Sequence, residues 1–189
     1  MGRVITINSS TLVNKGLELI EAALLYGVGL DDIVVAVHPQ SVVHSMVEFT
    51  DGSTLAQASP PDMRLPIGLA LTWPDRLPGA AVPCDWTRPA IWTFEPLDDA
   101  TFPAVELARR AGNAAGTAPA VYNAANEVLV DAFCDHRIGF LGITDLISRC
   151  LAEHLETGHV PDTELTLEAV LSADAAARER ARELVEELS

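Results

Sequence analysis

The hydrophobic and polar positions at the start of the chain predict a short strand that leads into a helix. A β-prone run at residues 4–7 passes through small hydroxyl residues, and apolar residues then recur at spacings of four, three and four: Val13, Leu17, Ile20 and Leu24. This spacing predicts an amphipathic helix with these side chains as its buried stripe. Ser9 or Ser10 is expected to cap it, because a serine hydroxyl can accept from a free N–H of the first turn.

Strand patterns follow the first helix. The continuous apolar run at residues 33–37 predicts a strand covered on both faces. Asp51-Gly52 is a strong hairpin signal, and it joins the runs 42–49 and 54–58. The first part of the chain is therefore expected to contain a sheet.

A change of composition marks the end of this part. A short helix is predicted over residues 65–73 and is closed by Pro74. Five prolines and all three tryptophans then fall between residues 73 and 98. We interpret this window as an extended connector whose aromatic rings clamp onto neighbouring domains.

The rest of the chain has helical patterns. A short segment at 104–111 precedes three longer helices, for which we predict caps at Asn123, Thr144 and Ser172. Four helices with short connections predict a small antiparallel bundle. The expected fold class is thus α+β, with a sheet domain at 1–72, the connector at 73–98 and a four-helix bundle at 99–189.

Charge and cysteine content exclude several classes of function. Twelve basic residues stand against 27 acidic ones, and a formal charge of −15 argues against nucleic acid as a partner. No uninterrupted apolar run reaches 18 residues and no signal pattern opens the chain, so no membrane association is expected. The three cysteines (Cys84, Cys134 and Cys150) lack metal-type spacing, which favours reduced thiols and a cytoplasmic location.

The first helix carries the strongest candidate chemistry. Lys15 is the only lysine beside eleven arginines, and it lies three residues from Glu18, within side-chain reach. Free N–H groups, hydroxyls, an ammonium and a carboxylate together suit a phosphorylated substrate beside a metal ion. The pattern alone leaves a second interpretation open, in which this is an ordinary capped and solvated helix.

Other polar residues give weaker signals. His38 and His44 would share a strand face if Pro39 did not interrupt it, but two histidines are weak evidence for zinc. Asp62 and Arg64 could line a cleft or form a loop ion pair. Helix capping fully explains the Asn126-Glu127 pair.

Several runs of the sequence, taken together and in order, resemble the 1-deoxy-D-xylulose 5-phosphate reductoisomerase family. Each run is weak alone, but the series is specific and covers essentially the whole chain: Met1-Gly2-Arg3, residues 8–18, residues 37–46, Asp51-Gly52-Ser53, Pro61-Asp62-Met63-Arg64 and Asn123-Ala124-Ala125-Asn126-Glu127. The family commonly has aspartate where Asn8 stands, a difference that leaves the helix site intact.

The resemblance implies roles at matching positions. It implies that Ser9, Asn14, Lys15 and Glu18 bind the substrate, that Lys15, Glu18 and His44 act in catalysis, and that Glu18 ligates a divalent metal (Mg, Mn or Co). Gly2 and Met63 match residues at the NADPH cofactor, and His44 also closes over the substrate. A further implication is a homodimer of the full-length enzyme.

The resemblance also implies that this chain corresponds to the C-terminal half of the enzyme. No G-x-G-x-x-G motif follows a strand, and the short acidic motif that supplies the other metal carboxylates is missing. The expected family activity converts 1-deoxy-D-xylulose 5-phosphate and NADPH to 2-C-methyl-D-erythritol 4-phosphate in non-mevalonate isoprenoid synthesis. We expect the isolated chain to be inactive. Two alternatives remain, an inactive fragment that keeps only association surfaces and an unrelated metal-dependent lyase or isomerase.

Overall fold

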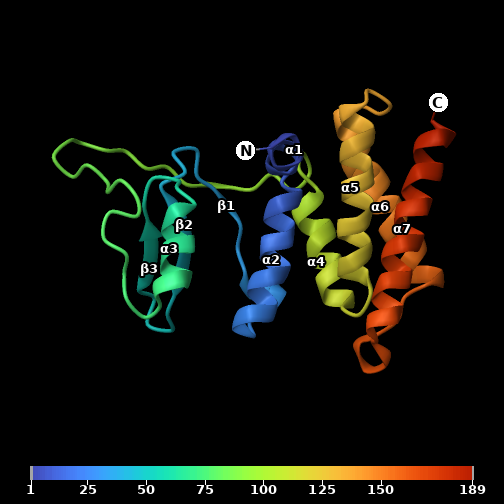
Figure 1. Cartoon of the computed structure of the whole chain (residues 1–189), viewed down its shortest axis with the longest axis horizontal. Helices are drawn as coiled ribbons and strands as arrows, with labels where there is room; N and C mark the ends of the chain where they lie inside the picture. The colour runs from blue at the N-terminus through green and yellow to red at the C-terminus, as the bar shows by residue number, and fades with distance from the viewer. Residues whose placement is uncertain (1, 189) are drawn as a thin grey trace. The chain divides into compact units, whose positions relative to one another are not determined.

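A computed structural model describes residues 2–188 and divides the chain into two compact units (Figure 1). One unit combines Met1–Val35 with Asp98–Ser189, and the other is Ala36–Leu97. The compact units thus group the first 35 residues with the C-terminal helices, which differs from the linear division at residues 72 and 98. Because helices, a hairpin and short ladders occur in one chain, the predicted α+β class is confirmed.

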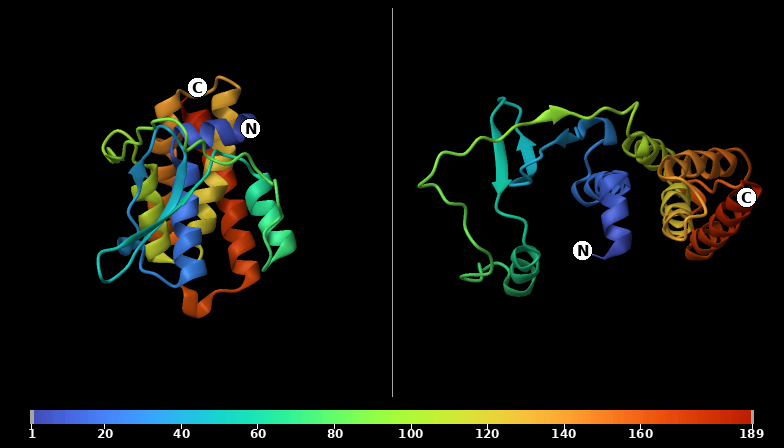
Figure 2. Two further views of the ribbon diagram at one scale, coloured as in Figure 1. Left: turned by 90° about the vertical axis from the view of Figure 1, so that its left-hand side faces the viewer. Right: turned by 90° about the horizontal axis from the view of Figure 1, so that it is seen from above.

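The first unit is helical. Its elements are α1 (Arg3–Ser10), α2 (Val13–Tyr26), the 3-10 turn η1 (Leu30–Asp32), α4 (Ala104–Ala114), α5 (Ala118–Cys134), α6 (Phe140–Thr157), the 3-10 turn η2 (Asp162–Glu164) and α7 (Leu167–Glu187). Figures 1 and 2 show α1 crossing the end of α2, whereas the axes of α2, α4, α5 and α7 are roughly aligned, with α2 and α4 running opposite to α5 and α7. Among residues 2–188, every helix is too short or too polar to cross a bilayer.

Helix α5 lies at the centre of this unit, with neighbours on several sides. It contacts α6 and α7, and it also contacts α1, α2 and α4. Val121 and Ala124 pack against Ala173 and Ala177 of α7, and all four side chains are buried. The fully buried Tyr122 donates its hydroxyl proton to the carbonyl of Ala104, 3.0 Å away in α4. Apolar burial on more than one face of α5 therefore holds the helical unit together.

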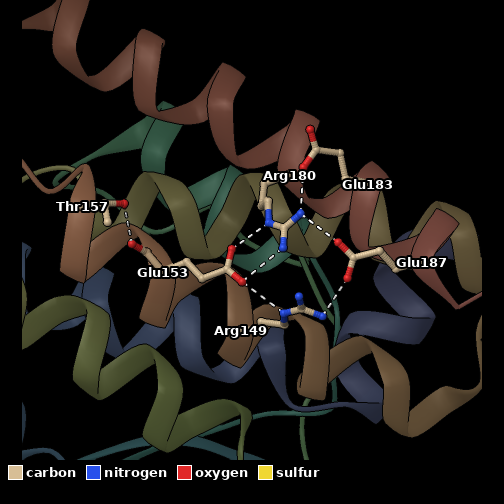
Figure 3. A network of polar contacts seen from close by, with 6 residues as sticks. All are labelled: Arg149, Glu153, Thr157, Arg180, Glu183 and Glu187. Carbon is tan, nitrogen blue, oxygen red and sulfur yellow. Dashed lines mark hydrogen bonds and ion pairs between the residues drawn. The ribbon is translucent and has the colours of Figure 1, made fainter.

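Charged side chains join α6 to α7 at the surface (Figure 3). Arg180 donates hydrogen bonds to both carboxylate oxygens of Glu153, at 2.7 and 3.2 Å, and it also reaches Glu183 and Glu187. Arg149 connects the same Glu153 and Glu187, at 3.0 Å each. Two arginines and three glutamates thus form one network.

The predicted strand at residues 4–7 is wrong, because these residues lie in α1. Ser9 and Ser10 fall in the last turn of α1, and neither caps α2, which begins at Val13 after Leu12. Tertiary contacts with α2 and α5 override the β propensity of the short run. The predicted stripe is correct at Val13 and Ile20, whereas Leu24 is 79% exposed.

In the second part of the chain α4 begins at Ala104 as predicted, but the helix starts predicted at Asn123, Thr144 and Ser172 are wrong. Helix α5 begins five residues before Asn123, and Asn126 and Glu127 therefore lie in its interior. Helix α6 begins before Thr144, and α7 begins before Ser172, where Thr166 accepts a hydrogen bond of 3.1 Å from the N–H of Ala169. Several polar residues could cap each helix, and the sequence pattern did not distinguish among them.

The second unit contains the predicted hairpin. Strands β2 (Val43–Glu48) and β3 (Thr54–Ala58) are antiparallel, and the Asp51 carboxylate accepts from the N–H of Ser53 at 2.9 Å in their turn. A two-residue ladder pairs β1 (Ala36–Val37) with β4 (Glu95–Pro96). The covered strand predicted at residues 33–37 is wrong, because only its last two residues pair and Val34 is 85% exposed.

The short helix and the connector complete the second unit. Helix α3 (Arg64–Thr72) lies close to its predicted bounds and ends before Trp73. The rings of Trp86 and Trp92 lie 5.7 Å apart, while Trp73 and Trp86 are largely exposed. Their expected clamping onto neighbouring domains stays a prediction.

Candidate functional site

A tight corner between α1 and α2 sets the direction of the helix that carries the candidate site. Thr11 is buried, and its N–H and hydroxyl both donate to the carbonyl of Ile7, at 2.9 and 3.0 Å. Leu12 adopts a left-handed conformation (φ 62°), which is uncommon for a residue with a bulky side chain. The first hydrogen bond of α2 then runs from the N–H of Gly16 to the carbonyl of Leu12, 3.0 Å away. The N–H groups of Asn14 and Lys15 come before this hydrogen bond, in the first turn, where backbone N–H groups have no carbonyl partner within the helix.

The predicted contact between Lys15 and Glu18 on α2 is present, and together with Asn14 these residues form a surface that we call the polar face. The side-chain amide of Asn14 donates to one carboxylate oxygen of Glu18 at 2.5 Å, and the ammonium of Lys15 forms an ion pair with the other oxygen. The Lys15 and Glu18 side chains are 41% and 46% exposed. Both carboxylate oxygens are therefore oriented by donors while the group stays open to a ligand.

The opposite face of α2 is packed so closely that a side chain would not fit at Gly16. A Cβ atom there would lie 2.6 Å from the Cβ of Ala108 and 2.8 Å from the hydroxyl oxygen of Tyr122. Together with the buried Val13, Leu19 and Ile20, this contact fixes α2 against the rest of the helical unit. The polar face consequently stands on a rigid support.

Ser9 and Gly2 lie at opposite ends of α1. Ser9 is exposed in the last turn, next to the α1–α2 corner. Gly2 precedes the first turn, and its carbonyl accepts from the N–H and the hydroxyl of Thr6, at 3.1 and 3.2 Å. No described atom lies within 4 Å of a Cβ built on Gly2, so neighbours within the chain do not require glycine there.

The described residues do not form a complete metal site. Among residues 2–188, no group of three or more His, Cys, Asp or Glu side chains is arranged to hold a metal ion. Glu18 is the carboxylate on the polar face, and a hard divalent cation needs several oxygen ligands. The donor set on α2 therefore fits one ligand of such an ion and not the whole coordination shell.

His44 and Met63 belong to the second unit. The β2–β3 register shifts between Val43 and Ser45, so His44 is the extra residue of a β-bulge, and its side chain is exposed. Bulges often re-aim a side chain beside a functional site. Met63 is 71% exposed at the start of α3.

Asp62 and Arg64 form the loop ion pair that was the simpler of the two expectations. Arg64 donates to both oxygens of Asp62, with its shortest contact at 2.6 Å. This hydrogen bonding lowers the pKa of the carboxyl to about 2. The ionised Asp62 carboxylate thus orients the side chain of Arg64, the residue that follows Met63.

His38 has a structural environment instead of a metal environment. Its ring nitrogen Nδ1 lies 2.8 Å from the carbonyl oxygen of Thr93, and its ring stacks on Phe94 with the centroids 4.5 Å apart. Gln40 also bonds to Thr93, at 3.0 Å through its side-chain amide. His38 therefore joins β1 to the segment before β4. Within residues 2–188, no further His, Cys, Asp or Glu side chains are arranged with it to hold a zinc ion.

Sequence reasoning missed two residues that support α2, and it also missed the bulge at His44. Thr11 closes the α1–α2 corner, and Gly16 allows the close packing behind the polar face. A glycine within a strong helix pattern is itself a signal of close packing and could have identified Gly16. A bulge leaves no comparable trace in a period-two pattern.

Comparison with known proteins first defines a class. A family model of the DXP reductoisomerase C-terminal domain matches residues 58–180, and a second model, of the 1-deoxy-D-xylulose 5-phosphate reductoisomerase C-terminal domain, matches residues 1–26. The solved structure of the Zymomonas mobilis reductoisomerase in complex with NADPH is 46% identical with a TM-score of 0.88, over 97% of this chain and 47% of that one. A crystal structure of DOX-P reductoisomerase in complex with NADPH, fosmidomycin and magnesium is 36% identical with a TM-score of 0.93, over 100% of this chain and 47% of that one. The fold is that of a C-terminal reductoisomerase domain.

Sequence relatives then give the particular family. The 1-deoxy-D-xylulose 5-phosphate reductoisomerase of Cutibacterium acnes is 70% identical over 97% of this chain, and that of Kitasatospora griseola is 63% identical over 97%. The chain spans about half the length of these relatives, 47% of each. The chain belongs to the 1-deoxy-D-xylulose 5-phosphate reductoisomerase family, as its sequence motifs predicted.

Proposed function

We propose that this chain supplies the substrate-binding helix and one metal ligand to a 1-deoxy-D-xylulose 5-phosphate reductoisomerase. The observation that carries the proposal is the polar face of α2, where Glu18 bonds to both Asn14 and Lys15 while its carboxylate stays partly exposed. The identity of 70% to a reductoisomerase supports the same activity here. The reaction would convert 1-deoxy-D-xylulose 5-phosphate and NADPH to 2-C-methyl-D-erythritol 4-phosphate.

The residues of this chain would bind and orient the substrate. Asn14 and Ser9 offer neutral donors, and Lys15 offers a compact ammonium for the oxygens of a phosphorylated sugar. The first-turn N–H groups of α2 add positive potential at the same end of the helix. His44, exposed on the bulge of β2, would close over the substrate, and Met63 and Gly2 would contact the nicotinamide cofactor.

The metal and NADPH would be held largely by residues outside this chain. Glu18 would provide one carboxylate to a Mg, Mn or Co ion, and three similar structures of DOX-P reductoisomerase were solved with magnesium. When bound, the metal would polarise the substrate carbonyl and NADPH would deliver the hydride. Because the described residues lack a full donor set, no reaction step is assigned to the ion on this chain.

The assembly and location follow from the same proposal. We infer a homodimer for the full-length enzyme and a cytoplasmic location, without nucleic acid or membrane partners. The charge of −15 supports the exclusion of nucleic acid. The three free cysteines are compatible with a reducing compartment.

A second candidate function is association without catalysis. The exposed apolar side chains Leu24, Leu25 and Tyr26 near the end of α2 favour it, because such a cluster suits a protein contact. In that case the chain would be an inactive fragment that binds other polypeptides. We expect no NADPH consumption by the 189-residue chain alone with substrate and manganese, and a rate well above a metal-only blank would contradict this.

Substitutions on α2 test the proposed function in a chimera that joins the preceding half of the Cutibacterium acnes relative to this chain. Glu18→Gln should weaken metal activation, because it replaces a charged oxygen ligand by a neutral one. Lys15→Arg should also slow turnover, since a planar guanidinium cannot occupy the place of a compact ammonium without displacing the substrate. A loss on the order of a hundredfold in kcat is expected from such a displacement.

Glu21→Gln is the matched control for these two variants. Glu21 is exposed about one turn beyond Glu18 on α2 and has no role implied by the family resemblance, so its amide variant should keep wild-type rates. If Glu18→Gln and Lys15→Arg also keep wild-type rates and metal dependence, the polar face is an ordinary solvated helix surface. The proposed site would then be wrong.

A further inference from the structure

Asn126 is a buried asparagine without a visible partner in the middle of α5. Its side chain is 0% exposed, and neither its amide nitrogen nor its amide oxygen has a hydrogen-bond partner among the described residues. Three residues earlier, Asn123 donates to Glu127 at 2.9 Å and is only half-buried. A buried amide without partners is costly, so a native protein retains one where it has a role.

The position of Asn126 on α5 indicates the direction of its side chain. It follows Tyr122 by four residues, and residues at this spacing lie on one helix face. Tyr122 bonds to Ala104 of α4 and lies against Gly16 of α2. Asn126 therefore lies one turn further along the face that α5 presents to α2 and α4, and α1 also contacts α5.

Helix α1 carries a matching group. The side-chain oxygen of Asn8 is shielded from solvent and has no hydrogen-bond partner. Within the described parts of the helical unit (2–35 and 98–188), the shielded side-chain atoms without a partner all belong to Asn8 and Asn126. The two asparagines lie on helices in contact, and Asn126 has the donor that the oxygen of Asn8 lacks.

We propose that Asn126 is a positioning residue that links α5 to Asn8 through one buried, bridging water molecule. The amide nitrogen of Asn126 donates to the water, and the water donates to the side-chain oxygen of Asn8. A polar, enclosed space with several partners is the kind of place where a single buried water is stable.

The link would act on the α1–α2 corner. Asn8 lies three residues before Thr11, whose bonds to Ile7 hold the corner from the α1 side, and Leu12 there has an unfavourable left-handed backbone. Fixing the end of α1 to the centre of the helical unit would keep α2 and its polar face in one orientation. This consequence for the site rests on the proposed function, whereas the link itself does not.

Replacing Asn126 by leucine, a side chain of similar size without polar atoms, tests the link in the 189-residue chain. If Asn126 holds Asn8, Asn126→Leu leaves the Asn8 oxygen unpaired, and the Tm of the helical unit should fall by on the order of 5 °C. If the amide is merely unpaired, the same change should raise the Tm, since it removes a costly polar group. Circular dichroism at 222 nm follows this transition, and a raised Tm would overturn the proposal.

A double-mutant cycle identifies the partner. Asn8→Ala alone should also lower the Tm, and the Asn126→Leu/Asn8→Ala double variant should lose clearly less than the sum of the single changes. Additive losses would contradict the link. Asn123→Leu is the matched control on the same helix, and it should show no coupling to Asn8→Ala. Asn126→Ser, which keeps a donor, replaces the leucine variant in the cycle if the latter does not fold.

Backbone amide NMR separates positioning from general stability. Well below the Tm, Asn126→Leu should shift the resonances of residues 8–18 while those of α7 stay in place beyond the neighbours of the mutation. A lower Tm with unmoved resonances at Asn14, Lys15 and Glu18 would overturn the positioning role. Failure of the Lys15 and Glu18 variants to affect the chimera would refute the proposed function and leave these Tm and NMR outcomes unchanged.

Discussion

At the scale of single residues, the packing behind the polar face depends on a glycine. Gly16→Ala would add a methyl group 2.6 Å from the Cβ of Ala108 and 2.8 Å from the hydroxyl oxygen of Tyr122. Alanine favours a helix by about 1 kcal/mol over glycine, but overpacking of this kind typically costs about 1 to 3 kcal/mol and displaces the backbone. We expect a net fall in the free energy of unfolding, measured by urea titration.

Gly2→Ala is the control for this change. A Cβ on Gly2 meets no described atom within 4 Å, and its φ of −70° suits any residue. The free energy of unfolding should therefore stay within about 0.5 kcal/mol of wild type. Equal effects of the two substitutions would mean that α2 can move away from α4 at little cost.

A histidine pair gives the helical unit a dependence on pH. The hydroxyl of Thr117 accepts from the N–H of Val160 at 3.1 Å and lies 2.8 Å from Nε2 of His154, to which it can donate. Burial lowers the pKa of His154, and the positive charge of the nearby His159 lowers it further. The folded state therefore binds fewer protons than the unfolded state at mildly acidic pH.

This sign predicts that stability is complete above the unfolded pKa, about 6.5, and falls as the pH drops below it. His154→Gln should flatten the dependence of Tm on pH between about 7.5 and 5, because glutamine does not titrate. His44→Gln, at an exposed position on β2, is the control, and its Tm should depend on pH as the wild-type Tm does. An unchanged slope in His154→Gln would contradict the assignment.

At the scale of elements, the α6–α7 network contributes to stability through shared partners. Arg180 bonds Glu153, Glu183 and Glu187, and its hydrogen bonds lower the pKa of Glu153 (Figure 3). The lowered pKa makes this contribution complete at neutral pH, and it is lost as the pH falls through the folded pKa. Arg180 is 30% exposed, so solvent screens part of the interaction.

Replacement of Arg180 by methionine keeps much of its length and removes the charge. The free energy of unfolding should fall at low ionic strength and should fall less at about 1 M salt, because salt screens partly exposed pairs. Arg110→Met, at an exposed position on α4, should change the free energy of unfolding by about 0.5 kcal/mol or less. A loss independent of salt would indicate packing of the arginine stem instead of its charge.

The sequence predicted elements better where the signal was local. Asp51-Gly52 correctly predicted the hairpin, and the spacing of Lys15 and Glu18 correctly predicted that their side chains are in contact. Residues 4–7 were mistaken for a strand, because contacts with α2 and α5 decide their conformation and no local pattern contains those contacts. The bulge at His44 and the buried Asn126 equally depend on partners distant in sequence.

At the scale of the whole molecule, helix α7 and the segment at residues 33–37 should differ in protection from hydrogen exchange. Buried residues occur along α7 from Ala173 to Val185, and α7 is packed on α5 and α6. Residues 33–37 pair only at their last two positions, and Val34 is largely exposed. We therefore expect slower amide exchange at 177–185 than at 33–37, measured by mass spectrometry or NMR. Stronger protection at 33–37 would contradict this.

The β1–β4 ladder has a consequence for how this family can change length. The chain leaves the helical unit after Val35 and returns at Asp98, and the intervening residues begin and end in one antiparallel pairing, Ala36 with Pro96 and Val37 with Glu95. Paired positions in such a ladder lie about 5 Å apart, so the intervening segment behaves as a guest domain with both ends at one point of attachment. Insertions or deletions between β1 and β4 change this inserted segment, but they do not change the distance between the two points where it joins the helical unit. Evolution can therefore remodel the hairpin and connector while the contact of α2 with α4, and the polar face that it supports, stays constant.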